Sequence, residues 1–286
     1  MQSRNVVEHL SSALLAMSIA AANGKRGSAF SDSRKERTAF DDVNDRVQAI
    51  VDAMLDESNP LRVLEAGCGS RSHIQLSRNT QIVGIDVSEE MLERNDQLDE
   101  KIRGDIQTYP LDHSSFDIIF CWDVLEHLPH PERALQNFMR AVREGGIIVL
   151  GAPVANSLKG TITKLTPLWF HVWVFRHLLK NNVAGTKGHG PFPTFFKKSM
   201  SPGSIERWAR EQQMLIELCT LYRDAMETRL RKKHWTIDLA FRILRPLLAV
   251  LSLGKINPDV TDFVIVLKRP VDSMAALASG TLARPA

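Results

Sequence analysis

Two short, mainly apolar runs most constrain how this chain can fold. The first is Leu61–Ala66, which leads into Gly67-Cys68-Gly69-Ser70, and the second covers residues 82–85 and ends at Asp86. Such runs are typical of buried parallel strands, and glycine lets the backbone of the turn approach a ligand closely. Ligands of open α/β sheets bind beyond the carboxyl ends of the strands. A glycine turn and an acid ending the next strand therefore predict a nucleoside site, in which Asp86 accepts the ribose hydroxyls.

Three further motifs follow in chain order. Gly104-Asp105-Ile106 stands where a third strand is expected to end, and residues 115–123 are expected to form a fourth strand that leads into residues 124–128. Residues 143–150 then give a glycine turn and a fifth apolar run. This ordered set, which covers roughly residues 61–152, resembles the class I S-adenosylmethionine-dependent methyltransferases. The resemblance is strongest to the type 11 branch, which includes the ubiquinone and menaquinone biosynthesis methyltransferases.

The resemblance implies an α/β fold, with a Rossmann-like, seven-stranded, doubly wound sheet whose last strand is antiparallel. Apolar residues at helical spacing predict helices over residues 40–55 and 131–142. Residues 214–222 and 262–268 are predicted to be the sixth and seventh strands. Long segments follow strands five and six where the minimal fold has short connections, and we predict that they are lid insertions.

The same resemblance implies S-adenosyl-L-methionine as the cofactor and assigns its contacts residue by residue. Glu65 is expected to orient the methionine end, directly or through water. Asp105 is expected to bond the adenine amino group while Ile106 packs on the ring. Met91 is a candidate for one wall of the adenine pocket, with plain core packing as an equally compatible alternative. The predicted cofactor-binding residues are Glu65, Gly67, Gly69, Asp86, Met91, Asp105, Ile106 and Trp122.

Methyl transfer from a sulfonium requires little of the protein beyond holding two reactants in line. A phenol or alcohol acceptor would also gain from a histidine general base. His127 is the preferred catalytic candidate over His130, His171 and His189, because it lies just past the fourth strand. A structural hydrogen-bonding role is the alternative for such a histidine. No His-x-x-x-His or Cys-x-x-Cys spacing occurs, so we predict no metal site.

The length and composition suit one domain with additions. The chain has 286 residues, 44% of them hydrophobic and 24% charged, which is ample for one α/β core. Residues 1–39 are predicted to be an N-terminal arm, partly disordered, and residues 271–286 a disordered tail. The methyltransferase domain is predicted over residues 40–270, with insertions at about 153–202 and 223–260.

Charge and cysteine content limit the partners and the compartment. A net charge of +3 does not by itself indicate nucleic acid, and we predict no nucleic-acid partner. Three widely separated cysteines argue against a disulfide framework and fit a reducing compartment. The apolar residues 13–22 match a signal-peptide core or an N-terminal helix, and they are too few for a membrane span. A domain that needs an intracellular cofactor is expected to be cytoplasmic.

The two insertions carry the signals about the acceptor and the membrane. Residues 168–175 are dense in aromatics, and residues 185–196 form an aromatic loop interrupted by Gly and Pro. This composition predicts an apolar or aromatic pocket over the acceptor, with packing on the core as the alternative. Residues 229–251 contain a basic cluster that ends at Trp235, followed by an apolar helix at 239–251. That pattern is typical of a peripheral membrane helix, although a helix that packs on the lid would look similar.

These features predict a methyltransferase that O-methylates a small lipophilic or aromatic acceptor. C-methylation of a quinone precursor is the alternative within the enzyme class. A protein that binds the cofactor without catalysis is the alternative outside it. A glycine turn is also compatible with NAD, but the order of the later motifs argues against that nucleotide.

Overall fold

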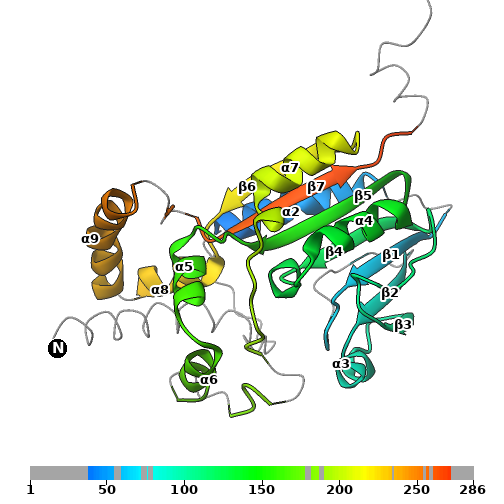
Figure 1. Cartoon of the computed structure of the whole chain (residues 1–286). Helices are drawn as coiled ribbons and strands as arrows, with labels where there is room; N and C mark the ends of the chain where they lie inside the picture. The colour runs from blue at the N-terminus through cyan, green and yellow to red at the C-terminus, as the bar shows by residue number, and fades with distance from the viewer. Residues whose placement is uncertain are drawn as a thin grey trace, which may run out of the picture. The chain divides into compact units, whose positions relative to one another are not determined.

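Figure 1 shows the fold of the chain in a computed structural model. The structure describes residues 38–54, 59–71, 76, 80–177, 182–186, 190–233, 235–253, 256–257 and 260–271. Residues 1–37 of the predicted arm, which include the apolar run at 13–22, and the predicted tail beyond Val271 lie outside the described residues. The described chain divides into two compact units. The sheet unit comprises residues 47–152, 197–220 and 264–271, and the insertion unit comprises residues 38–46, 153–196 and 221–263.

One seven-stranded sheet organises the fold. Its strands are β1 (Leu61–Ala66), β2 (Thr80–Asp86), β3 (Glu100–Arg103), β4 (Phe116–Trp122), β5 (Val142–Pro153), β6 (Leu215–Tyr222) and β7 (Asp262–Lys268), in the order β3-β2-β1-β4-β5-β7-β6. The pairs β1–β2, β2–β3, β1–β4 and β4–β5 are parallel. The chain moves outward from β1 to β3 and then returns to β4 on the other side of β1. The switch point of the sheet therefore lies between β1 and β4.

The last strand runs against its neighbours. The N–H of Gly145, near the start of β5, donates to the carbonyl of Arg269, just past β7. At the other end, the N–H of Val154, just past β5, donates to the carbonyl of Thr261, just before β7. Early β5 thus pairs with late β7, so β7 is antiparallel. The predicted α/β sheet with an antiparallel last strand is confirmed, while the lid role of the insertions stays a prediction.

The helices attached to the sheet include the two that apolar spacing predicted, over residues 40–55 and 131–142. They are α2 (Ala39–Asp52), α3 (Glu89–Arg94), α4 (Pro131–Ala141) and α7 (Pro202–Glu211), with short 3-10 helices η2 (Leu125–His127) and η3 (Lys198–Met200). Ser88 and Ser201 cap α3 and α7 by accepting hydrogen bonds from backbone N–H groups. Phe138 of α4 is fully buried, as is Ile118 of β4, because the apolar stripe of the helix faces inward.

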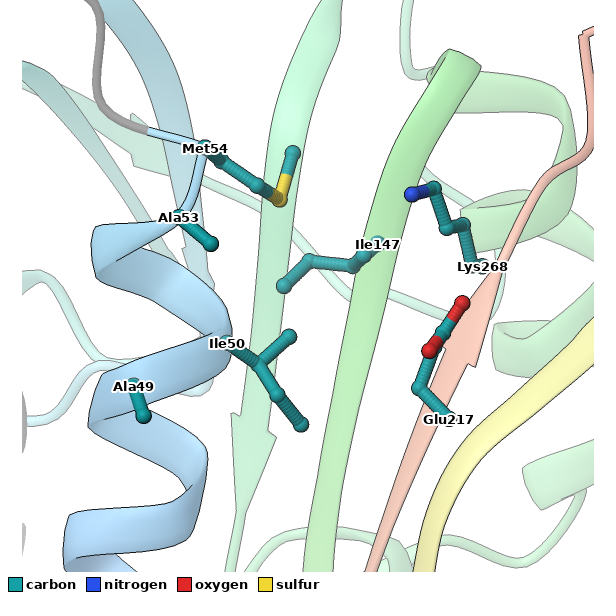
Figure 2. Close-up of a pocket in the computed structure, with 7 residues that line it drawn as sticks. All are labelled: Ala49, Ile50, Ala53, Met54, Ile147, Glu217 and Lys268. Atoms are coloured by element: carbon teal, nitrogen blue, oxygen red, sulfur yellow. The ribbon is translucent and has the colours of Figure 1, made fainter.

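A hollow of about 300 Å³ lies between α2 and the sheet. Figure 2 shows it lined by Ala49 and Ile50 of α2, by Ala53 and Met54 just after that helix, by Ile147 of β5, and by Glu217 and Lys268 of β6 and β7. Glu217 stands near the start of β6, and Lys268 ends the antiparallel β7. The hollow is therefore at the opposite edge of the sheet from the carboxyl ends of β1 to β5.

The insertion unit is mainly helical. Its helices are α5 (Leu158–Leu165), α6 (Leu168–His177), α8 (Ala225–Lys233) and α9 (Trp235–Leu251). Ser157 is buried and caps α5, because its hydroxyl accepts from the N–H of Gly160 and donates to the carbonyl of Val154. None of the helices that the structure describes is long and apolar enough to cross a membrane.

Arg231 holds α8 against α9. Its Nε and Nη2 donate to one carboxylate oxygen of Asp238 at 2.9 and 2.7 Å, and its Nη1 donates to Glu227 at 3.4 Å. The guanidinium also lies over the ring of Phe241, 5.0 Å from its centroid. Burial raises the pKa of Glu227, whereas the positive charges of Arg223 and Arg231 act to lower it. Arg231 is thus the shared partner of a buried acid and of the first turn of α9.

We predict that Arg231→Met lowers the free energy of unfolding by about 3 kcal/mol, because it removes one of the two counter-charges of the buried Glu227 together with both hydrogen bonds to Asp238. Arg242→Met is the matched control, since Arg242 bonds the same Asp238 but its side chain is 72% exposed. That control is expected to cost less than about 1 kcal/mol. Urea titration followed by circular dichroism measures both variants. Equal losses in the two would contradict the role given to Arg231.

Candidate functional site

The carboxyl edge of the parallel strands brings most of the predicted site residues together. Glu65 is in the penultimate position of β1, with Gly84 of β2 and Phe120 of β4 as its register partners. Asp86 ends β2, and Trp122 ends β4. Because these strands are parallel, their ends meet at the switch point. Glu65 is buried there, within the sheet unit.

The glycine turn after β1 has two glycines that do different work. Both have positive φ, +73° at Gly67 and +56° at Gly69, which L side chains rarely adopt. A Cβ on Gly67 would collide with the side chain of Val124, so this glycine allows the turn to approach the segment after β4. A Cβ on Gly69 would have no atom of the described residues within 4 Å. The turn is therefore open beside Gly69 in this part of the structure, and the binding role predicted for this glycine stays a prediction.

The Asp86 carboxylate ties this turn to β2. Its Oδ2 accepts from the N–H of Gly69 at 3.0 Å, and its Oδ1 accepts from the N–H of Ser88 at 2.8 Å. An ionised carboxylate has about four lone-pair sites, so accepting capacity remains for two vicinal hydroxyls. The predicted ribose acid is thus held in place next to the open side of Gly69.

Asn95 supports the turn from the other side and was not predicted. It is fully buried at the end of α3, and its Nδ2 donates to the carbonyls of Gly69 at 3.3 Å and Cys68 at 3.5 Å. An asparagine at a helix end was the available sequence signal, but such residues most often satisfy their own helix. Only the fold shows that this amide fixes the glycine turn.

The residues assigned to the adenine end lie after β3 and on α3. The carboxylate of Asp105 accepts from the backbone N–H and the side-chain amide of Gln107. Ile106 is only 4% exposed, so most of its side chain already packs inside the sheet unit. Met91 is half-buried, and its N–H donates to the hydroxyl of Ser88 at 3.4 Å. The adenine roles of these three residues stay predictions.

The end of β4 is a strained corner. Asp123 has φ +54°, which is uncommon for a residue other than glycine, and its N–H donates to the carbonyl of Gly151. The indole of Trp122 lies against Gly151, where a Cβ would meet it at 2.5 Å. His127 follows on η2, half-buried, with its Nε2 3.8 Å from a carboxylate oxygen of the buried Glu126. Backbone strain of this kind is often found at functional sites.

Three of the four candidate histidines are described, and their surroundings differ. His130 precedes α4, and its Nδ1 is 3.4 Å from Glu132. His171 is buried in the insertion unit, where burial lowers its pKa and Nε2 lies 2.8 Å from the hydroxyl of Thr166. His189 is outside the described residues. His127 is therefore the one of these that combines partial exposure with a place directly after β4.

The thiols beside the site are not nucleophiles at neutral pH. Burial, with smaller effects from the charges of Asp86 and Glu65, raises the pKa of Cys68 to about 12. Burial and the charge of Glu126 also raise the pKa of Cys121. Both side chains are therefore neutral thiols that pack in the sheet unit, since only thiolates react readily.

The donor and acceptor set fits a nucleoside with a charged amino-acid substituent. Asp86 offers acceptors for hydroxyls, Asp105 offers acceptors for an amino group, and the buried Glu65 offers a carboxylate for an ammonium group. The glycine turn leaves the backbone accessible from its open side. Because β1, β2 and β3 are parallel neighbours, these groups follow the ends of adjacent strands along one edge of the sheet.

The part of the chain that contains these strand ends matches a known protein family. Residues 64–150 match the Methyltransf_11 family, described as a methyltransferase domain. A malonyl-[acyl-carrier protein] O-methyltransferase of Pectobacterium atrosepticum is 32% identical over 124 residues, which cover 41% of this chain and 47% of that protein. A mitochondrial ubiquinone biosynthesis O-methyltransferase of Candida albicans is 27% identical over 175 residues, covering 56% and 48%. The chain thus spans less than half the length of these relatives.

Solved structures with a related arrangement include two methyltransferases. A SAM-dependent methyltransferase from Methanosarcina mazei is 17% identical, with a TM-score of 0.47 over 78% of this chain and 97% of that one. A putative methyltransferase from Bacillus halodurans is 15% identical, with a TM-score of 0.48 over 80% of this chain and all of that one (100%).

Proposed function

Because residues 64–150 are a methyltransferase domain of the S-adenosylmethionine-dependent type 11 family, we propose that this chain transfers a methyl group from that cofactor to oxygen of a small lipophilic or aromatic acceptor. The observation that carries the proposal is the Asp86 carboxylate, which Gly69 and Ser88 hold beside the open side of the glycine turn. S-adenosylmethionine, when bound, supplies a methyl group that its sulfonium already activates.

The work left to the protein is binding and orientation. Asp86 would accept hydrogen bonds from the ribose hydroxyls, Asp105 would accept one from the adenine amino group, and Glu65 would hold the ammonium of the methionine end. Together these residues would hold the donor at the edge of the sheet where β1 and β2 end, next to the segment that carries Trp122 and His127. Holding the two reactants in line is enough to supply most of the acceleration.

His127 is the proposed general base. His127 would accept the proton of an acceptor hydroxyl at a neutral imidazole nitrogen while that oxygen takes the methyl group, the bond between methyl carbon and sulfur breaks, and S-adenosylhomocysteine is left. The imidazolium would then release the proton to water. The nearby Glu126 carboxylate, 3.8 Å from Nε2, is placed to stabilise the imidazolium. A histidine suits this step because its ordinary pKa lies near neutrality.

Two observations support the proposal of a small lipophilic or aromatic acceptor, one from the relatives and one from the insertion unit. Two curated relatives are named as O-methyltransferases, one of them in ubiquinone biosynthesis. Trp169, Trp173, Phe192 and Phe195 in the insertion unit expose a large part of their side chains, which suits contact with a lipophilic molecule. C-methylation of a quinone precursor is the second candidate, and the position of the added methyl group in the product distinguishes the two.

We expect the wild-type protein to bind S-adenosylmethionine in calorimetric titrations and not to bind NAD. Asp86→Ala should weaken cofactor binding by about 1 to 3 kcal/mol, because charge-assisted hydrogen bonds to the ribose are lost. Asp112→Ala, which removes an exposed carboxylate elsewhere in the sheet unit, is the control and should change nothing. Binding of NAD without S-adenosylmethionine would refute the proposal.

For His127→Gln we expect kcat to fall by about a hundredfold or more, with cofactor affinity unchanged, because general-base catalysis contributes roughly 10²- to 10⁴-fold. The rate is measured as product formed with the best acceptor from a screen of lipophilic phenols and quinone precursors. His113→Gln changes an exposed histidine in the same way and should keep the wild-type rate. An unchanged rate in the His127 variant would remove this residue from the reaction.

The proposal includes peripheral membrane contact through residues 229–251. On α9, Trp235, Ile243 and Val250 are 75%, 62% and 73% exposed, and Leu239 is also exposed. Their spacing of four and seven residues places them on one face of the helix. The preceding α8 carries the basic run at residues 229–233, in which Arg231 bonds Glu227 and Asp238 while Lys232 is exposed. An apolar face beside positive charge is suited to an anionic lipid surface.

We predict that Trp235→Ser/Ile243→Ser reduces sedimentation of the protein with vesicles of phosphatidylcholine and phosphatidylserine by about tenfold, since two exposed apolar anchors are removed. Leu215→Ser/Leu221→Ser is the control, because it removes two exposed leucines from the edge strand β6. Equal sedimentation of the two double variants would show that the α9 face does not bind lipid.

A further inference from the structure

We infer that Gln107 is a positioning residue that orients the Asp105 carboxylate and thereby sets the preference of the site for adenine. The inference rests on the proposed function, because it concerns how the cofactor base is read. Gln107 lies in the turn after β3, two residues beyond the acid that it contacts.

Gln107 occupies most of the accepting capacity of Asp105. Its backbone N–H donates to Oδ1 at 2.9 Å, and its side-chain Nε2 donates to Oδ1 and Oδ2, each at 3.0 Å. A carboxylate has about four lone-pair sites, so these three bonds leave roughly one, on Oδ2, for an incoming donor. Asp105 is therefore prepared to accept a single further hydrogen bond in a fixed direction.

A second contact fixes which way the Gln107 amide points. Its Oε1 accepts from the backbone N–H of His130 at 2.9 Å. A backbone N–H is only a donor, and an ionised carboxylate is only an acceptor. One orientation of the amide alone satisfies both neighbours, with oxygen toward His130 and nitrogen toward Asp105. The side chain thus acts as a rigid link between the acid and the start of α4.

The helix to which this link is attached is itself fixed. Asn137, about two turns further along α4, is buried and donates to the carbonyls of Ile106 at 3.0 Å and Tyr109 at 2.7 Å. The turn that contains Asp105 is therefore hydrogen-bonded to the α4 segment at two places. Of these two contacts, the one made by Gln107 extends to the Asp105 carboxylate.

This arrangement discriminates between bases that differ in one group. The 6-amino group of adenine donates to a carboxylate, whereas hypoxanthine presents a carbonyl oxygen at the same position. When a carbonyl oxygen faces a fixed carboxylate oxygen, no hydrogen lies between them and no hydrogen bond forms. A site whose acceptor expects a hydrogen-bond donor on the ligand therefore rejects a ligand that lacks that donor. A carboxylate free to rotate would discriminate less, because it could turn away from the carbonyl.

The test is calorimetric titration of the folded full-length chain with S-adenosylhomocysteine and with S-inosylhomocysteine, in which hypoxanthine replaces adenine. The wild type should prefer S-adenosylhomocysteine. Gln107→Met keeps the length of the side chain but removes its hydrogen bonds, and we expect it to reduce that preference by about tenfold, which corresponds to roughly 1.4 kcal/mol. Gln136→Met, the same change on the exposed face of α4, should keep the wild-type preference.

The outcomes separate the inference from the proposed function. An equal loss of affinity for both ligands in Gln107→Met would indicate a merely structural role and overturn the inference. Gln107→Glu is the second variant if the methionine variant does not fold, because a second carboxylate cannot donate to Asp105 at pH 8. A wild-type preference in that variant would also overturn the inference. Failure of the wild type to bind S-adenosylhomocysteine would instead refute the proposed function.

Discussion

The parallel pairing of β1 with β2 on one side and β4 on the other is the constraint on which the rest of the structure depends. It buries the three strands and brings their carboxyl ends to one edge. Buried parallel strands leave little freedom there, because each backbone polar group is already committed to the sheet. Glu65, Asp86 and the turn after β1 are consequently fixed relative to one another before any ligand binds.

The glycine turn of the candidate site is fixed by contacts from three neighbouring segments. Asp86 holds Gly69 from β2, Asn95 holds the same turn from α3, and Val124 packs where only a glycine at position 67 fits. Because Val124 lies directly before η2, the glycine turn and the segment with His127 are in van der Waals contact.

The sequence predicted the elements well because their signals are local. Apolar spacing predicted α2 and α4, and the apolar run at 262–268 matches β7. The contacts of Asn95 and Gln107 could not be predicted in this way. Each amide bonds a group that the fold brings into reach, and a polar residue in a turn carries no sequence signal for its partner.

The sequence by itself determined the strands, the glycine turn and the acid at the end of β2, because glycine conformation and strand burial are properties of short segments. Only the tertiary structure decided that Asp86 binds the turn, that Trp122 lies on Gly151, and that Gln107 connects Asp105 to α4. Hydrogen bonds and packing of this kind join segments that are distant along the chain or depend on how a turn is held. Their geometry is fixed only when the whole sheet and its helices have formed.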